Sequence, residues 1–83
     1  VVSQNYPNPA SESTSFRITM EETGHVRVEV SNITGQVVQS LDQGSLNAGD
    51  HVIRLDLSDL HAGTYFYTVI TDQYTVSKQM IIK

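Results

Sequence analysis

Three histidines are the residues of this chain best suited to acid–base chemistry or metal binding: His25, His51 and His61. An imidazole titrates near neutral pH, and its neutral nitrogens bind transition metals. The three are separated by intervals that match no metal-binding spacing such as two histidines on one helical turn. His25 and His51 each open a strand-like segment after a glycine-containing turn, and His61 lies in a loop. We therefore interpret all three as exposed turn residues and predict no metal site.

Oxygen-bearing side chains cluster at Asp56, Ser58 and Asp59. Calcium requires about six to eight oxygen ligands, so these three are too few, and Ser58 or Asp59 is expected instead to cap a short helical turn. Asp59, His61 and a serine are the residue types of a hydrolytic triad, but no Gly-x-Ser-x-Gly turn is present to expose a nucleophile. The chain also contains no cysteine. We predict that it is not an enzyme and uses no cofactor.

Aromatic side chains offer a second kind of site, a platform for a sugar ring or a peptide. Tyr65, Phe66 and Tyr67 are consecutive in an apolar segment, so we expect them to pack in the core. Tyr6 and Tyr74 are the candidates for an exposed aromatic pair.

Length and charge limit the classes of function. The 83 residues form one domain of 9.2 kDa with a net charge of −4 and no run of basic residues. Nucleic-acid binding requires clustered Lys and Arg, so nucleic acid is not an expected partner. The longest uncharged apolar stretch, residues 64–71, is far shorter than the roughly 18 residues of a membrane span. Because the chain starts at Val1 without a leader, we expect it to be a piece cut from a longer protein.

Alternating apolar and polar residues predict β-strands over most of the chain. The clearest are residues 16–20 and 26–30, and residues 21–24, ending in Gly24, are expected to join them as a hairpin. Residues 32–35 predict a turn, although Asn32-Ile33-Thr34 also matches a glycosylation acceptor. Residues 36–42 alternate poorly, which predicts a strand between two partners or one with a bulge.

The second half of the chain continues this pattern. Residues 43–50 are expected to form a loop, residues 51–57 a strand, and residues 58–63 one short helical turn. Residues 64–71 predict a central strand and residues 75–82 a last strand, in which Lys78 has the parity of the apolar residues. That strand either bulges at Lys78 or carries the lysine along a sheet edge. Together these elements predict an all-β fold, a small antiparallel immunoglobulin-like β-sandwich of six to seven strands.

Four motifs in order resemble one family, the type A C-terminal sorting domains of the type IX secretion system. They are QNYPNPA at residues 4–10, NITGQ at 32–36, LHAGTYFY at 60–67 and KQMII at 78–82. The opening and the Gly-x-Tyr strand are also similar to those of flagellar hook-capping immunoglobulin-like modules.

The resemblance to sorting domains implies a function that composition and periodicity do not. Such domains lie at the C-terminus of proteins exported by certain Gram-negative bacteria. They pass through the periplasm and are recognised by the outer-membrane translocon. A sortase-like protease often removes them and attaches the cargo to the cell surface. The resemblance therefore implies an exported, non-catalytic signal, with residues 1–83 as a single C-terminal domain of unknown oligomeric state.

Placed on this chain by position, the family motifs assign a recognition role to eight residues, and residues 78–83 become the terminal recognition strand. The eight are Pro7, Asn8, Pro9, Gly35, Gly63, Tyr65, Lys78 and Lys83. A terminal strand can be recognised by strand addition at a sheet edge, and Lys78 is then a contact. Lys78 could equally protect that edge from aggregation, while Pro7-Asn8-Pro9 and Gly63 could serve only to close one end and to form a turn. The alternative function is an immunoglobulin-like accessory module that binds carbohydrate or anchors an enzyme to the cell surface.

Overall fold

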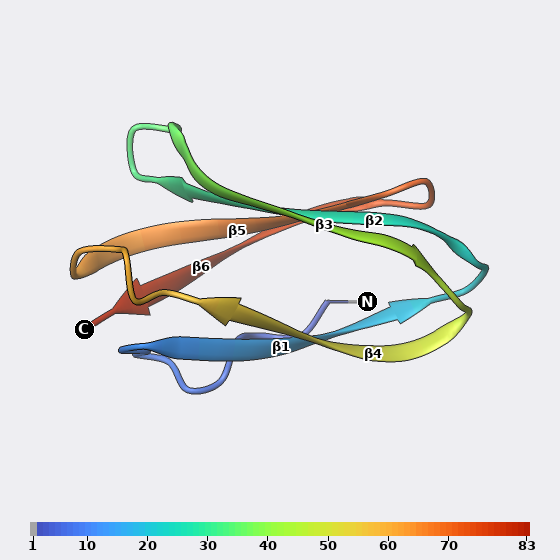
Figure 1. Ribbon diagram of the computed structural model, residues 1–83, viewed down its shortest axis with the longest axis horizontal. Helices are drawn as coiled ribbons and strands as arrows, with labels where there is room; N and C mark the ends of the chain where they lie inside the picture. Colours follow the sequence, from blue (N-terminus) through green and yellow to red (C-terminus); the bar gives the residue numbers. More distant parts are fainter. Residues whose placement is uncertain (1) are drawn as a thin grey trace.

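The computed structural model describes residues 2–83, which form six strands joined by turns (Figure 1). The strands are β1 (Ser13–Met20), β2 (Gly24–Asn32), β3 (Val37–Leu46), β4 (Gly49–Asp56), β5 (Gly63–Thr71) and β6 (Thr75–Ile82). Over residues 2–83 no segment is helical, so the predicted all-β class is confirmed. In this part of the chain there is accordingly no helix that is long and apolar enough to span a membrane.

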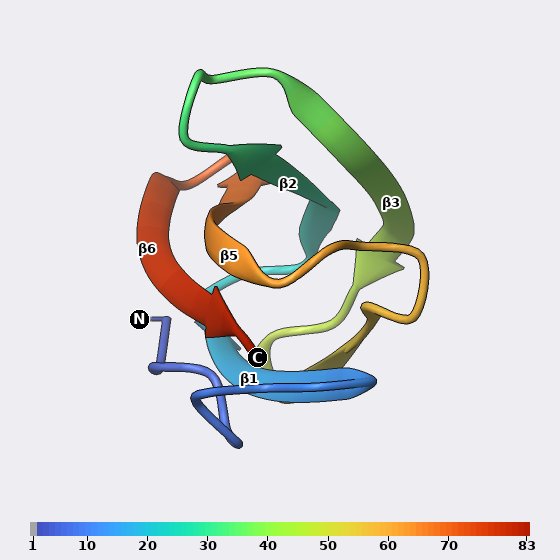
Figure 2. The same ribbon diagram turned by 90° about the vertical axis from the view of Figure 1, so that its left-hand side faces the viewer.

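The strands form two antiparallel sheets that pack face to face (Figures 1 and 2). One sheet pairs β1 with β4, and the other has the order β3-β2-β5-β6. Val2 and Tyr6 form isolated bridges to β1, so the N-terminal segment extends the smaller sheet. This pairing is the predicted immunoglobulin-like sandwich, with the N-terminal segment as an incomplete seventh strand.

The predicted hairpin between the first two strands is wrong. β1 and β2 lie in different sheets, and residues 21–23 cross from one to the other. Gly24 does not have the positive φ that a tight hairpin turn would require. A Cβ at Gly24 would lie 3.3 Å from Cε of Met20, so this glycine serves close packing at the crossing. The crossing lets the apolar faces of β1 and β2 contribute to one common core.

The core lies between the two sheets and follows the period-two pattern. Alternate residues of β1, β2, β4 and β5 are buried, which confirms the period-two pattern that the sequence predicts for these strands. Tyr67 is fully buried and stacks on Phe16 of the opposite sheet, with 4.5 Å between ring centroids. The buried apolar residues are Val2, Ala10, Phe16, Ile18, Met20, Val26, Val28, Val30, Ile53, Leu55, Leu57, Tyr65, Tyr67, Val69, Met80 and Ile82.

β3 differs from its prediction in place and length. It is an edge strand rather than a strand between two partners, and its pairing with β2 shifts register at two points, which confirms the bulge. It also runs on to Leu46, and β4 begins at Gly49, so the predicted loop at 43–50 shrinks to residues 47–48. Gly44, with a φ of 71°, allows β3 to continue through the irregularity.

Two predictions for the second half of the chain are confirmed and one is wrong. β5 is central, between β2 and β6, and β6 has the predicted bounds. The predicted helical turn at 58–63 is instead one non-helical turn over residues 57–60. The Leu60 N–H closes it by donating to the Leu57 carbonyl at 3.0 Å. The carboxylate of Asp56, rather than Ser58 or Asp59, caps this turn by accepting from the Ser58 N–H and Oγ.

Candidate functional site

A buried polar pair holds the proline-rich segment in place. The side chains of Asn5 and Thr14 are 3% and 1% exposed, and the Asn5 amide donates to Thr14 Oγ1 at 3.0 Å. Both side chains also donate to the Pro7 carbonyl, at 3.2 and 2.9 Å. Because buried polar groups are costly unless they are paired, these bonds favour one conformation of the loop.

The loop that contains Pro7, Asn8 and Pro9 lies against the terminal strand β6. Asn8 Oδ1 accepts from the Ile81 N–H at 3.1 Å. Two residues later, the Ala10 N–H donates to the Ile81 carbonyl at 2.8 Å, and the Lys83 N–H donates to the Ala10 carbonyl at 2.7 Å. Ala10 is fully buried at this contact. Asn8 and Lys83, distant in sequence, are therefore close to each other in space.

Gly63 and Tyr65 begin β5 beside the end of β6. Gly63 is paired with Ile82 and Tyr65 with Met80. Gly63 has a φ of 154°, in a region essentially restricted to glycine, as the chain turns into β5. The Tyr65 ring is buried, and its hydroxyl donates to the His61 carbonyl at 2.9 Å. Both residues thus shape the start of β5.

Gly35 lies in the turn between β2 and β3. Its φ is 89°, and its N–H donates to the Asn32 carbonyl at 3.0 Å. Asn32 Oδ1 accepts from the N–H groups of Thr34 and Gln36, which confirms the predicted turn. Asn32 is paired with Tyr65, so this turn lies at the same end of the sandwich as the start of β5.

Seven of the eight predicted recognition residues therefore gather at one end of the sandwich, which we call the C-terminal end. It comprises the β2–β3 turn (residues 32–36), the β4–β5 connection (57–62), the proline segment (7–10) and residues 81–83. Figure 1 shows the β2–β3 turn, the β4–β5 connection and the C-terminus together at the left. Lys78 lies further back along β6.

Lys78 has inward parity and is half-buried on the edge strand. It is paired with Tyr67, and the β5–β6 register is unbroken from the pair Gly63–Ile82 to the pair Ile70–Thr75. The predicted alternative of a bulge at Lys78 is therefore wrong. The other alternative places the lysine along a sheet edge, and β6 is the edge strand of its sheet, as that alternative requires. Among residues 2–83 the ion pairs are His25–Asp42 and Arg27–Glu29, and neither involves Lys78.

The histidines are dispersed. His25 lies on the outer face of β2, with Nε2 2.8 Å from Asp42 Oδ1 on β3. The Gly44 N–H bonded to that carboxylate lowers the pKa of Asp42, and His25 adds to this effect. His51 Nε2 lies 2.6 Å from the Asn47 carbonyl, and His61 is exposed. His25 and His51 thus lie within strands rather than in turns, and residues 2–83 hold no cluster of His, Asp and Glu suited to a metal ion.

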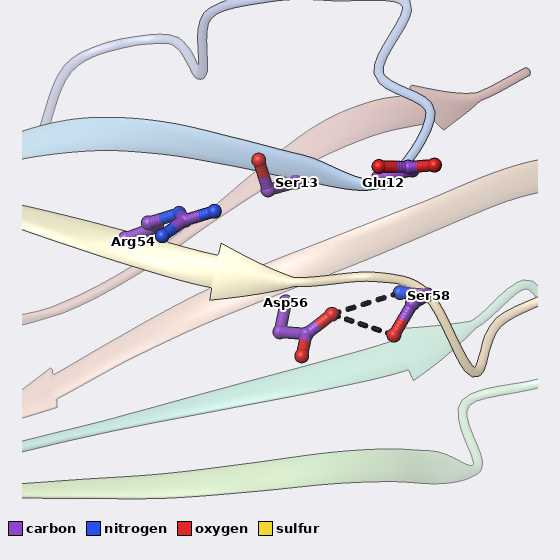
Figure 3. A pocket seen from close by; sticks show the side chains of 5 residues that line it. All are labelled: Glu12, Ser13, Arg54, Asp56 and Ser58. Atoms are coloured by element: carbon purple, nitrogen blue, oxygen red, sulfur yellow. Dashed lines mark hydrogen bonds between the residues drawn. The ribbon is translucent and has the colours of Figure 1, made fainter.

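A polar cleft of about 300 Å³ lies at the start of β1 (Figure 3). Glu12, Ser13, Arg54, Asp56 and Ser58 line it. In Figure 3 the Asp56 carboxylate accepts both bonds from Ser58, and these two bonds lower the pKa of Asp56. A carboxylate with a lowered pKa is a weak general base, and none of the three histidines lines the cleft. The arrangement closes a turn and does not position a nucleophile.

The predicted aromatic pair of Tyr6 and Tyr74 does not form a platform. The Tyr74 hydroxyl donates to the Thr19 carbonyl at 3.0 Å, the ring packs against the core, and burial raises the pKa of Tyr74. Tyr6, in contrast, is 82% exposed and is paired with Ser15 near the start of β1, whereas Tyr74 lies at the end of that strand. Phe66 also departs from its prediction, since it is 36% exposed on the outer face of β5.

Sequence reasoning missed the residues that hold the proline segment, namely Gln4, Asn5, Ala10 and Thr14. Gln4 and Ala10 bond to β6, which is far along the chain, whereas Asn5 and Thr14 lie nine residues apart and, as polar residues, produce no hydrophobic periodicity. The available signal was the density of Asn, Ser and Thr around the prolines, which are residue types that bond to nearby backbone groups.

The fold and this closed end define a class of protein, a small immunoglobulin-like module whose terminal strand is held by its own N-terminal segment. The family model of the secretion system C-terminal sorting domain matches residues 4–83. The chain therefore belongs to the sorting domains of the type IX secretion system, as its motifs indicate.

A solved structure supports this assignment. The crystal structure of dimeric latent PorU from Porphyromonas gingivalis is similar to this chain with a TM-score of 0.77 and 26% sequence identity. The similarity covers 99% of this chain and 9% of the PorU chain, so the present domain spans only a small part of that protein's length. No curated protein sequence matches the chain.

Proposed function

We propose that residues 1–83 are a non-catalytic C-terminal signal that directs an upstream cargo through the type IX outer-membrane translocon for secretion or attachment to the cell surface. The observation that carries the proposal is the match of the family model to residues 4–83. The gathering of seven motif residues at the C-terminal end is consistent with it, since one receptor surface could contact them together.

The partners in this proposal are the translocon and a sortase-like protease, and the cargo is a larger exported protein that ends in this domain. The domain passes through the periplasm with its cargo and then reaches the cell surface or the medium. The small share of PorU that the chain covers supports a role as one module of a longer protein. The eight motif residues are proposed as the recognition set. Pro7, Asn8, Pro9 and Lys83 are the members whose side chains are exposed at the C-terminal end.

A reporter fusion tests the proposal. Residues 1–83 are joined to the C-terminus of an inert exported reporter, in a host with type IX machinery and in a mutant that lacks it. Delivery to the surface or medium is expected only in the intact host. Deletion of residues 78–83 is unsuitable as a control, because Met80 and Ile82 are buried.

A charge-matched pair of variants replaces that deletion. The double variant Lys78→Ala/Lys83→Ala is expected to reduce delivery. Arg17→Ala/Arg54→Ala removes the same charge from the outer face of the other sheet and is expected to leave delivery unchanged. Retention of the unaltered fusion in the periplasm of both hosts would contradict the sorting function.

A second candidate function rests on Tyr6. Its exposed ring borders an open groove of about 290 Å³ that Gln4, Arg17 and Val52 also line. An exposed aromatic ring beside polar groups can stack on a sugar, which would make the domain a carbohydrate-binding accessory module. This candidate predicts weak glycan binding that Tyr6→Ala abolishes, measured on a glycan array and by titration. Equal glycan binding by the unaltered domain and the Tyr6→Ala variant would reject this candidate.

A further inference from the structure

The backbone of β6 has two edges, and the hydrogen bonds at its end show which groups face away from β5. The N–H and C=O of Ile81 bond to Asn8 and Ala10, and the Lys83 N–H bonds to Ala10. Because backbone groups alternate along a strand with a period of two, those of Gln79, Ser77 and Thr75 face the same way. The groups of the even-numbered residues pair with β5.

The N-terminal segment bonds only to the C-terminal half of this edge of β6. Gln4 Nε2 donates to the Gln79 carbonyl at 2.7 Å, and Asn8 and Ala10 occupy Ile81. Within residues 2–83, no group bonds to the outward N–H and C=O of Thr75 and Ser77 or to the N–H of Gln79, since β6 is the last strand of its sheet. The open backbone therefore lies at residues 75–79, whereas the N–H and C=O of Ile81 and the N–H of Lys83 are already hydrogen-bonded to the N-terminal segment.

The charge beside this open edge favours one kind of partner. Lys78 is the charged residue within the open stretch, is half-buried and forms no ion pair with residues 2–83. Two copies of the chain that paired through this edge would place their Lys78 side chains as neighbours on one face. Like charges at such positions oppose pairing, whereas a carboxylate on the added strand would favour it.

We propose that residues 75–79 are the site at which an extended acidic segment of the export receptor adds to β6 as a further strand, with a carboxylate facing Lys78. This inference rests on the proposed sorting function. The main-chain groups of Thr75 and Ser77 and the N–H of Gln79 supply the hydrogen bonds, and Lys78 supplies the charge preference. The N-terminal segment sets where the added strand ends.

A proline at Ser77 tests the site, because it removes an N–H that faces the open edge and leaves the β5–β6 ladder intact. Proline is tolerated at such edge positions. Ser77→Ala is the matched control, since both variants lose the hydroxyl that lies 2.7 Å from Thr68 Oγ1. In the reporter fusion, Ser77→Ala is expected to be delivered like the unaltered domain, and Ser77→Pro and Lys78→Glu about tenfold less, equivalent to about 1.4 kcal/mol of binding.

Each outcome decides a different point. If the unaltered fusion is not delivered, the sorting function itself fails. If Ser77→Pro melts like Ser77→Ala and is delivered equally well, strand addition is refuted.

Thr75→Pro repeats the test at the next outward N–H. Loss of cooperative melting in both proline variants would show that these groups do not face an open edge. A dimer of the unaltered domain that Ser77→Pro dissociates, measured by analytical ultracentrifugation, would assign the edge to a second copy and overturn the proposal.

Discussion

Replacement of Tyr67 by phenylalanine should lower the stability of the domain at neutral pH and raise it, relative to the original protein, at high pH. The Tyr67 ring is fully buried, stacks on Phe16, and donates its hydroxyl hydrogen to the Ser3 carbonyl at 2.8 Å. Phenylalanine keeps the ring and loses this hydrogen bond, so we expect the free energy of unfolding to fall by about 1 kcal/mol at pH 7.

The high-pH behaviour follows from the phenol. Burial raises the pKa of Tyr67 to about 12 from its ordinary value of 10.0, and a bond from the Asn5 N–H opposes part of this shift. The folded protein therefore holds the phenol proton more tightly than the unfolded chain does. The corresponding stability is complete below pH 10 and is lost as the pH rises through the folded pKa. The loss reaches about 1.4 kcal/mol at about pH 11.

The two proteins should consequently be equally stable at a pH between about 10 and 11. The assay is urea unfolding followed by far-UV circular dichroism, for both proteins, at a series of pH values from about 7 to about 11. Titration of Tyr74, whose pKa is also raised, affects both proteins equally and cancels in the difference. A constant difference in unfolding free energy across the series would refute the reasoning, because Tyr67 would then not resist ionisation in the folded state.

Three further predictions concern packing, a turn and the proline segment. Tyr65→Ala should cost about 3–5 kcal/mol by leaving a cavity, and Lys78→Ala less than about 1 kcal/mol, in denaturant melts; equal losses would reverse the assignment of core and edge. Gly35→Ala should cost about 1–2 kcal/mol because its φ of 89° is unfavourable for alanine, and an unchanged melting temperature would argue against this turn. Asn8→Ala should speed amide hydrogen exchange at Ile81 relative to its unchanged neighbours in β5, and equal exchange would show that Asn8 does not hold β6.

The prediction of individual strands from sequence succeeded where one face of the strand is buried. The apolar segment at residues 64–71 identified β5 as a central strand, but the structure was needed to show that Tyr65, Tyr67 and Val69 face inward while Phe66 faces outward. β3 alternates poorly because it is an edge strand with two register shifts, and its extension to Leu46 left no signal in the apolar pattern.

Strand pairing was less predictable. Residues 21–24 carry the signal of a turn, but a turn within one sheet and a crossing between two sheets use similar residues. Only the pairing of β1 with β4, and of β2 with β3 and β5, distinguishes the two cases. A bond from Gln73 Nε2 to the Glu22 carbonyl, which joins the crossing to the β5–β6 turn, also depends on the complete fold.

The candidate site shows the same division. The motif residues were identified from the sequence, but their gathering at the C-terminal end was not, because Asn8 and Ile81 are far apart in the chain. The buried pair of Asn5 and Thr14 had no signal in the hydrophobic pattern. Sequence reasoning assigned recognition to residues 78–83, whereas the structure leaves the open backbone at residues 75–79.

The amino-acid sequence by itself determined the all-β class, the inward faces of β1, β2, β4 and β6, and the family. These properties depend on local alternation and on short motifs, which a linear chain records directly. The tertiary structure alone decided which strands share a sheet, which groups of β6 remain unpaired, and which polar residues hold the proline segment. The first two depend on contacts between residues that are distant in sequence, and the third depends on the burial of Asn5 and Thr14, which exists only once both sheets have packed around the common core.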